Sequence, residues 1–112
     1  MTVYVVQKQM RYNPQTGQPE PRFPTITKAE RHGEIHYCLS PNEHPFNLDS
    51  VLGALHESLS GFSDDDHLIL VGNPILLGSA SVIAAHYNEG RVKFLQWSAK
   101  QNDYIVIKAQ IY

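Results

Sequence analysis

Residues 68–97, LILVGNPILLGSASVIAAHYNEGRVKFLQW, hold the pattern that decides the fold. The run Leu68–Val71 is apolar without alternation, which is typical of a strand buried on both faces of a sheet. A Gly-Asn-Pro turn follows at 72–74, in which the asparagine can cap a helix and the proline can occupy its first turn. Small and apolar residues continue to about Asn88, and a second apolar run begins at Val92. The stretch therefore predicts a strand, a helix and a parallel strand.

A second helix is predicted upstream of this unit, from Leu48 to about Ser60. Its apolar residues recur at helical spacing, namely Leu48, Val51, Leu52, Leu55, Leu59 and Phe62. Asn47 stands where a capping residue is expected, and Gly61 supplies a stop.

Three further strands complete the expected architecture. They are residues 3–6, residues 34–39 with a period of two, and residues 104–111, which pair with residues 92–97 as a hairpin. The element order is β-β-α-β-α-β-β, so we expect one α/β domain over residues 1–112 with two helices. Right-handed crossovers predict a mixed five-stranded sheet with a three-stranded parallel centre flanked by antiparallel strands.

A proline-rich segment at about residues 10–26 interrupts this pattern. It carries four prolines, and we expect a long loop without regular structure. Tyrosine, phenylalanine and arginine are residue types that anchor protein interfaces. Arg11, Tyr12, Arg22 and Phe23 are therefore candidate interface residues.

The composition disfavours two classes of partner. The net charge is −2 and the pI is near 6.3, without the basic stripe typical of nucleic-acid-binding domains. The longest apolar run is far shorter than the roughly 20 residues that cross a bilayer, so no membrane insertion is expected. With a single cysteine, Cys38, and no signal-peptide pattern at the N-terminus, we expect a cytoplasmic protein.

No arrangement of residues in the sequence predicts catalysis, a metal or a cofactor. Cys38 lies inside a predicted strand, where a buried thiol is the favoured interpretation over a nucleophile. The acidic run 64–66 with His67 is interpreted as a solvated turn, since consecutive residues rarely converge on one ion. His32 and His36 are four residues apart, but Gly33 argues against the helix that would bring them together.

One candidate ligand site lies at the turn after the central strand. Gly72, Asn73 and the backbone amide of Ile75 would meet an anion at the start of a helix, beyond the carboxyl end of a parallel strand. Helix capping by Asn73 explains the same residues, and the capping interpretation is favoured.

Two more candidate contact surfaces follow from the C-terminal half. The helix after Pro74 is small or apolar almost all round, so Ser81 and Ala85 are candidate contacts of a homodimer. Trp97 is a candidate contact residue on a terminal strand, although a tryptophan in this place more often closes a core.

Residues 65–111 resemble a group of short proteins from bacteriophages and related mobile elements. The similarity rests on an acidic lead-in to an apolar strand (65–71), a Gly-Asp/Asn-Pro turn (72–74), an alanine-rich helix and a Gly-Arg-Val-Lys-Phe-Leu-x-Trp strand (90–97). The chain departs from the group at Ser98, where an acidic residue is usual, and in its longer proline-rich segment.

The resemblance implies a phage accessory protein that binds a host or phage protein in the host cytoplasm. The alternative is a small-molecule or nucleotide-binding protein that uses the turn at 72–75. The resemblance implies no catalytic residue.

Overall fold

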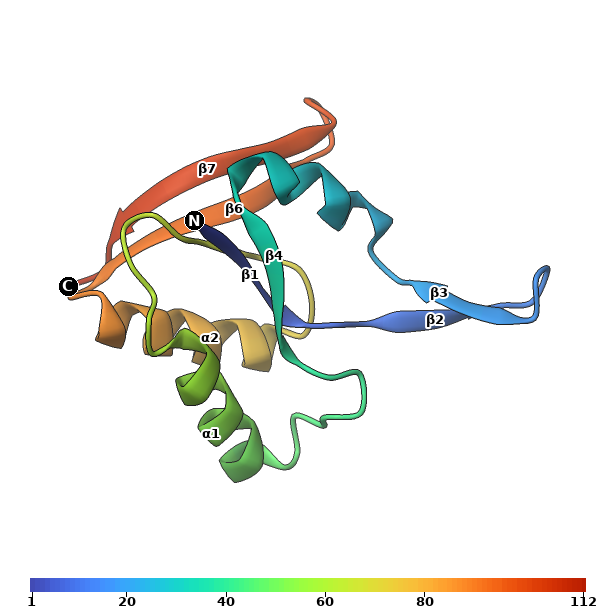
Figure 1. Ribbon diagram of the computed structural model, residues 1–112, viewed down its shortest axis with the longest axis horizontal. Helices are drawn as coiled ribbons and strands as arrows, with labels where there is room; N and C mark the ends of the chain where they lie inside the picture. The colour runs from blue at the N-terminus through green and yellow to red at the C-terminus, as the bar shows by residue number, and fades with distance from the viewer.

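The computed structural model describes residues 1–112 as a layered α/β domain with a projecting arm (Figure 1). The elements in chain order are β1 (Thr2–Gln7), β2 (Met10–Asn13), β3 (Gln18–Pro21), the 3-10 helix η1 (Pro24–His32), β4 (Glu34–Leu39), α1 (Leu48–Leu59), β5 (His67–Ile69), α2 (Pro74–Tyr87), β6 (Arg91–Ser98) and β7 (Asp103–Gln110). Five strands form one sheet in the order β4-β1-β5-β6-β7, and β2 pairs with β3 separately. The predicted mixed five-stranded sheet is confirmed, and β5 lies at its centre.

The direction and place of one strand, β1, differ from the expectation. β1 is parallel to both β4 and β5, and β5 is parallel to β6, so only β7 runs antiparallel to its neighbour. The sequence predicts that the strand at 3–6 flanks the parallel centre as an antiparallel strand, and this is wrong, because β1 lies between β4 and β5 and is parallel to both. The reason is that η1 carries the chain across the face of the sheet between β1 and β4, which makes their connection a crossover.

The helices α1 and α2 agree with the predicted ranges, but η1 is an additional third helix. It begins at Pro24 and buries Ile26 and Ala29, which are three residues apart and so lie above one another in a 3-10 helix. Because η1 is short and repeats every three residues, its apolar residues do not show the spacing that indicates an α-helix. None of the three helices has the length and apolar character needed to cross a membrane.

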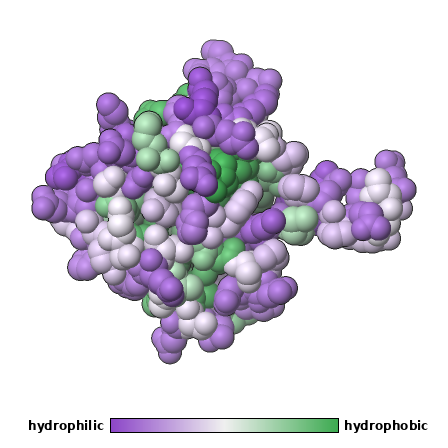
Figure 2. Space-filling model, viewed as in Figure 1, coloured by the Kyte–Doolittle hydropathy of each residue, from purple (hydrophilic) through white to green (hydrophobic).

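The segment expected to be an irregular loop instead contains the hairpin of β2 and β3, which we call the arm. Met10 pairs with Pro21 and Asn13 pairs with Gln18. Pro19 and Pro21 are two residues apart, so the backbone nitrogens that lack a hydrogen point to the same side of β3. In a two-stranded sheet this side can face solvent, so no hydrogen bond between β2 and β3 is lost. The prolines are therefore compatible with a strand here, and the arm stands clear of the body (Figures 1 and 2).

The sheet separates two apolar clusters. The larger cluster lies under α1 and α2 and includes Val6, Val51, Leu55, Leu59, Leu68, Leu76, Ala80, Ile83 and Val92. The smaller cluster lies under η1 and consists of Val3, Val5, Ile26, Ala29, Ile69, Leu95 and Tyr104. Helices thus cover both faces of the central strands, which explains why β5 reads as an apolar run without alternation.

Candidate functional site

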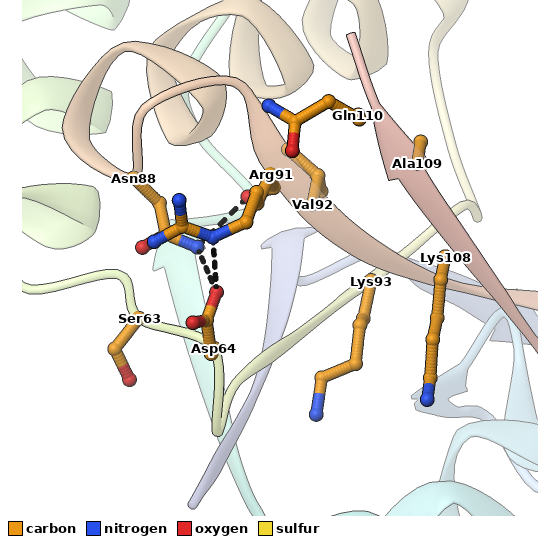
Figure 3. Close-up of a pocket in the computed structure, with 9 residues that line it drawn as sticks. All are labelled: Ser63, Asp64, Asn88, Arg91, Val92, Lys93, Lys108, Ala109 and Gln110. Atoms are coloured by element: carbon orange, nitrogen blue, oxygen red, sulfur yellow. Dashed lines mark hydrogen bonds and ion pairs between the residues drawn. The ribbon is translucent and has the colours of Figure 1, made fainter.

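One hollow on the body lies where β6 begins and β7 ends, beside the turn that precedes β5 (Figure 3). Its volume is about 450 Å³. The residues that line it are Ser63, Asp64, Asn88, Arg91, Val92, Lys93, Lys108, Ala109 and Gln110. Most of these side chains are polar, and three of them are cationic.

One wall of the hollow is a hydrogen-bonded network centred on Asp64. Arg91 Nε and Asn88 Nδ2 each donate to Asp64 Oδ1 at 2.9 Å, and Asn88 Nδ2 also donates to the carbonyl oxygen of Arg91. Hydrogen bonds from Arg91 and then Asn88 lower the pKa of the Asp64 carboxyl. Arg91 and Asp64 are therefore held in place, and the charge of Asp64 is directed toward Arg91.

The opposite wall carries two lysines that form no ion pair. Lys93 on β6 lies directly opposite Lys108 on β7, and neither takes part in any of the four ion pairs of the structure. Figure 3 shows the two side chains extending in the same direction from neighbouring strands. Neither lysine is predicted as a site residue from the sequence. Their only signal is that each is a polar residue inside an apolar strand, and their proximity depends on the register of the hairpin.

The acidic run 64–66 forms a turn as predicted, but it is not solvated throughout, because only Asp64 and Asp65 are exposed. Asp66 is buried, and its carboxylate accepts hydrogen bonds from the backbone nitrogens of Thr2 and Ser63, both at 2.9 Å. No group of three or more His, Cys, Asp or Glu side chains is arranged to hold a metal ion.

The two candidate histidines lie apart in the fold. The rings of His32 and His67 lie tilted against each other with centroids 5.2 Å apart, whereas His36 lies against Tyr4. The sequence spacing of four residues therefore does not create a common site.

The turn after β5 has the geometry of a helix cap. Asn73 Oδ1 accepts from the backbone nitrogens of Ile75 at 2.9 Å and Leu76 at 3.4 Å. Gly72 has φ +129°, a conformation that other residues rarely adopt. Gly72, Asn73 and Ile75 do not line the hollow at β6 and β7, the hollow between β4 and α1, or the hollow beside the arm. Because the Asn73 side chain already occupies two amides, binding of an anion here remains a prediction.

The four candidate interface residues near the arm divide into two pairs. Arg11 and Tyr12 lie on β2, where Arg11 Nε forms an ion pair with Glu20 at 2.7 Å and Tyr12 is 68% exposed. Arg22 and Phe23 lie at the base of the arm, where the Arg22 guanidinium sits 5.4 Å from the centre of the Phe23 ring. Phe23 also packs against the smaller apolar cluster, so it joins the arm to the body.

The candidate dimer contacts on α2 have different environments. Ser81 is half-buried and donates a hydrogen bond to the carbonyl oxygen of Leu77 at 2.7 Å. Ala85 is only 1% exposed and lies in the larger cluster, so the expectation that it faces a second copy is wrong. The outer side of α2 instead presents Ile75 and Val82, which are 59% and 70% exposed.

Trp97 packs inside the chain. Its ring lies edge-on to Tyr104 at 5.1 Å, and Lys28 Nζ lies 5.4 Å from its centre. Its half-buried side chain closes the smaller cluster beside η1.

A second hollow of about 660 Å³ lies between β4 and α1 and includes Cys38. Burial raises the pKa of the Cys38 thiol to about 11. The thiol is therefore protonated at neutral pH, which disfavours its use as a nucleophile.

Comparison with known sequences links the chain to one protein family. The sequence model of a family described as "Phage Pam3 gp32-like protein" matches residues 1–111. No curated protein and no solved structure matches the chain.

Proposed function

This chain belongs to the family of phage Pam3 gp32-like proteins, and from this membership we propose that it is a non-enzymatic accessory protein that binds a host or phage protein. The contact surface in this proposal is the arm formed by β2 and β3. The single observation that carries the proposal is the position of the arm, which extends away from both apolar clusters (Figure 1).

The chemistry of the arm supports a role in recognition. An isolated two-stranded hairpin is marginally stable in water and has two open edges, so it gains from pairing with another surface. Tyr12 presents a large aromatic ring at the surface, and tyrosine is enriched at the energetic centres of interfaces. Met10 adds an exposed apolar side chain on the same strand.

The arm is also internally ordered before any partner arrives. Glu20 accepts hydrogen bonds from Arg11 Nε at 2.7 Å and from Asn13 Nδ2 at 3.0 Å, across the two strands. The bonds from Asn13 and then Arg11 lower the pKa of the Glu20 carboxyl. Order of this kind reduces the entropy lost on binding.

Site-specific photo-crosslinking tests the proposal. A photoreactive amino acid is placed at Tyr12 and, as a matched control, at Phe46, which is 96% exposed in the loop before α1. We expect a discrete covalent adduct in phage-infected cells from the Tyr12 position and none from Phe46. The captured protein, once purified, should bind Tyr12→Ala at least about tenfold more weakly than wild type. Equal binding of both variants, or an adduct from Phe46 alone, would remove the arm as the contact surface.

The alternative function is binding of a small molecule or nucleotide at Gly72, Asn73 and Ile75. The strand order favours it, because β1 and β5 are neighbours whose following segments leave toward opposite sides of the sheet, and such points often bind ligands. A thermal-shift screen of nucleotides tests it, since a ligand at about 100 times its Kd stabilises a protein by about 2.7 kcal/mol.

A further inference from the structure

Three basic side chains form a row across three neighbouring strands. Leu68 on β5 is in register with Phe94 on β6, so the residues one position earlier, His67 and Lys93, are also neighbours. Lys93 is in turn directly opposite Lys108 on β7. The row lies on the face that η1 covers, because the His67 ring packs against the ring of His32, the last residue of η1.

The charges of this row are not balanced within the chain. Like charges directly opposite each other on neighbouring strands destabilise a sheet. Neither Lys93 nor Lys108 forms an ion pair, and Asp64, the one acid in the lining of the hollow, is bonded to Arg91 and acts on Lys93 only through space. The positive charges of Lys93 and Lys108 thus lie beyond the end of η1, on the wall of the hollow at β6 and β7.

Two buried nitrogens beside the lysines lack hydrogen-bond partners. They are His67 Nδ1 and His32 Nε2, and the His67 side chain is only 5% exposed. Burial, then Lys93 and then His32 lower the pKa of His67 to about 4, while Asp66 acts in the opposite direction. The histidines are therefore uncharged at neutral pH, and the charge of Lys93 acts on the buried ring of His67.

We propose that the hollow at Arg91, Lys93 and Lys108 binds the phosphate group of a small phosphate monoester. Two ammonium groups on adjacent strands suit a compact doubly charged anion, because lysine acts on phosphate as a point charge. Arg91, fixed by Asp64, borders the same space (Figure 3). The volume of about 450 Å³ accommodates a ligand larger than the phosphate itself.

The test uses inorganic phosphate and chloride at matched ionic strength and neutral pH. We expect phosphate at about ten times its Kd to raise the melting temperature of the wild type by about 5 °C relative to chloride. Lys93→Gln and Lys108→Gln should each weaken phosphate binding at least about tenfold. Lys100→Gln, in the exposed turn between β6 and β7, is the matched control and should retain the full effect.

A second measurement is independent of ligand. In chloride alone Lys108→Gln should melt at a higher temperature than the wild type, since removing one lysine relieves the repulsion between β6 and β7.

Adenosine monophosphate distinguishes a phosphate ester from free phosphate as the ligand. Tighter binding of adenosine monophosphate than of inorganic phosphate indicates an ester, and equal binding indicates free phosphate. Equal stabilisation by phosphate and chloride, or full phosphate stabilisation of the Lys93→Gln/Lys108→Gln double variant, would overturn the proposal.

Discussion

The carboxylate of Asp66 accepts a hydrogen bond from the backbone nitrogen of Thr2 at 2.9 Å, across 64 residues of chain. Its second oxygen accepts from the backbone nitrogen and the hydroxyl of Ser63, at 2.9 and 3.2 Å. One buried side chain thus joins the first residue of β1 to the turn that leads into β5. The acidic run in the sequence therefore serves to position two central strands.

Asp66→Ala should strongly destabilise the protein. It leaves the half-buried donors of Thr2 and Ser63 without their acceptor, and we expect a loss of about 2–4 kcal/mol in the free energy of unfolding. Asp65→Ala is the matched control, because Asp65 is exposed and should change stability by less than about 0.5 kcal/mol. Urea denaturation measures both values. Similar values for the two variants would contradict the structural role of Asp66.

Leu55→Ala should reduce stability by about 2–5 kcal/mol, because Leu55 is fully buried in the larger cluster and its truncation leaves a cavity. Leu52 belongs to the same sequence periodicity but is only half-buried, so Leu52→Ala should have a smaller effect. Ser60→Ala, at the exposed end of α1, should be close to neutral. Denaturation curves that rank Leu52→Ala above Leu55→Ala would show that α1 faces the sheet differently.

Stability should fall with acid through His67. The pKa of His67 is lowered from 6.5 to about 4 in the folded chain, chiefly by burial, with Lys93 and His32 adding to the effect. Between these pH values the unfolded chain binds a proton that the folded chain does not, so the free energy of unfolding decreases as pH falls from about 6.5 to about 4. The total loss is at most roughly 3 kcal/mol.

Denaturation at a series of pH values tests this prediction. His67→Gln should flatten the decline over this interval, whereas His44→Gln, at an exposed loop position, should leave it unchanged. An identical pH profile for wild type and His67→Gln would assign the decline to other groups.

The elements that could be predicted from sequence are those whose periodicity reflects burial. α1, α2, β5 and the β6–β7 hairpin each bury a pattern of apolar residues, and their observed ranges agree with the predicted ones, except that β5 spans His67–Ile69 where the sequence predicts 68–71. The arm could not be predicted, because prolines are unusual in strands. The helix η1 could not be predicted either, because the three-residue spacing of a 3-10 helix differs from the spacing that indicates an α-helix.

The candidate hollow depends on register, which single-sequence patterns do not specify. Lys93 and Lys108 are 15 positions apart and meet only because β6 and β7 pair residue by residue as far as Trp97 and Tyr104.

The burial of Ala85 on α2 could not be predicted for a different reason. A helix that is small or apolar all round has no polar side to reveal which face packs inward, so its inner and outer residues cannot be told apart from sequence.

Removal of the outer arm should leave the fold intact. A variant that lacks residues 15–20 loses most of β3 but no residue of either apolar cluster. Shortening a loop of this kind changes chain entropy only slightly, so cooperative unfolding and the melting temperature should be nearly unchanged. Calorimetry provides the measurement. Loss of a cooperative transition would make the arm a structural element and would weaken its proposed role in binding.

The homodimer remains a prediction, and substitutions on the outer side of α2 can test it. Ile75 and Val82 are exposed there, and a twofold-symmetric contact buries the same apolar side chains from both copies. Val82→Arg and Ser81→Arg should therefore yield monomers, since two like charges would have to be desolvated near the axis. Ser60→Arg, on the exposed end of α1, should leave assembly unchanged. Light scattering at tens of micromolar distinguishes the outcomes, because a wild-type species of 12.7 kDa would eliminate the dimer and leave Ile75 and Val82 as ordinary exposed residues.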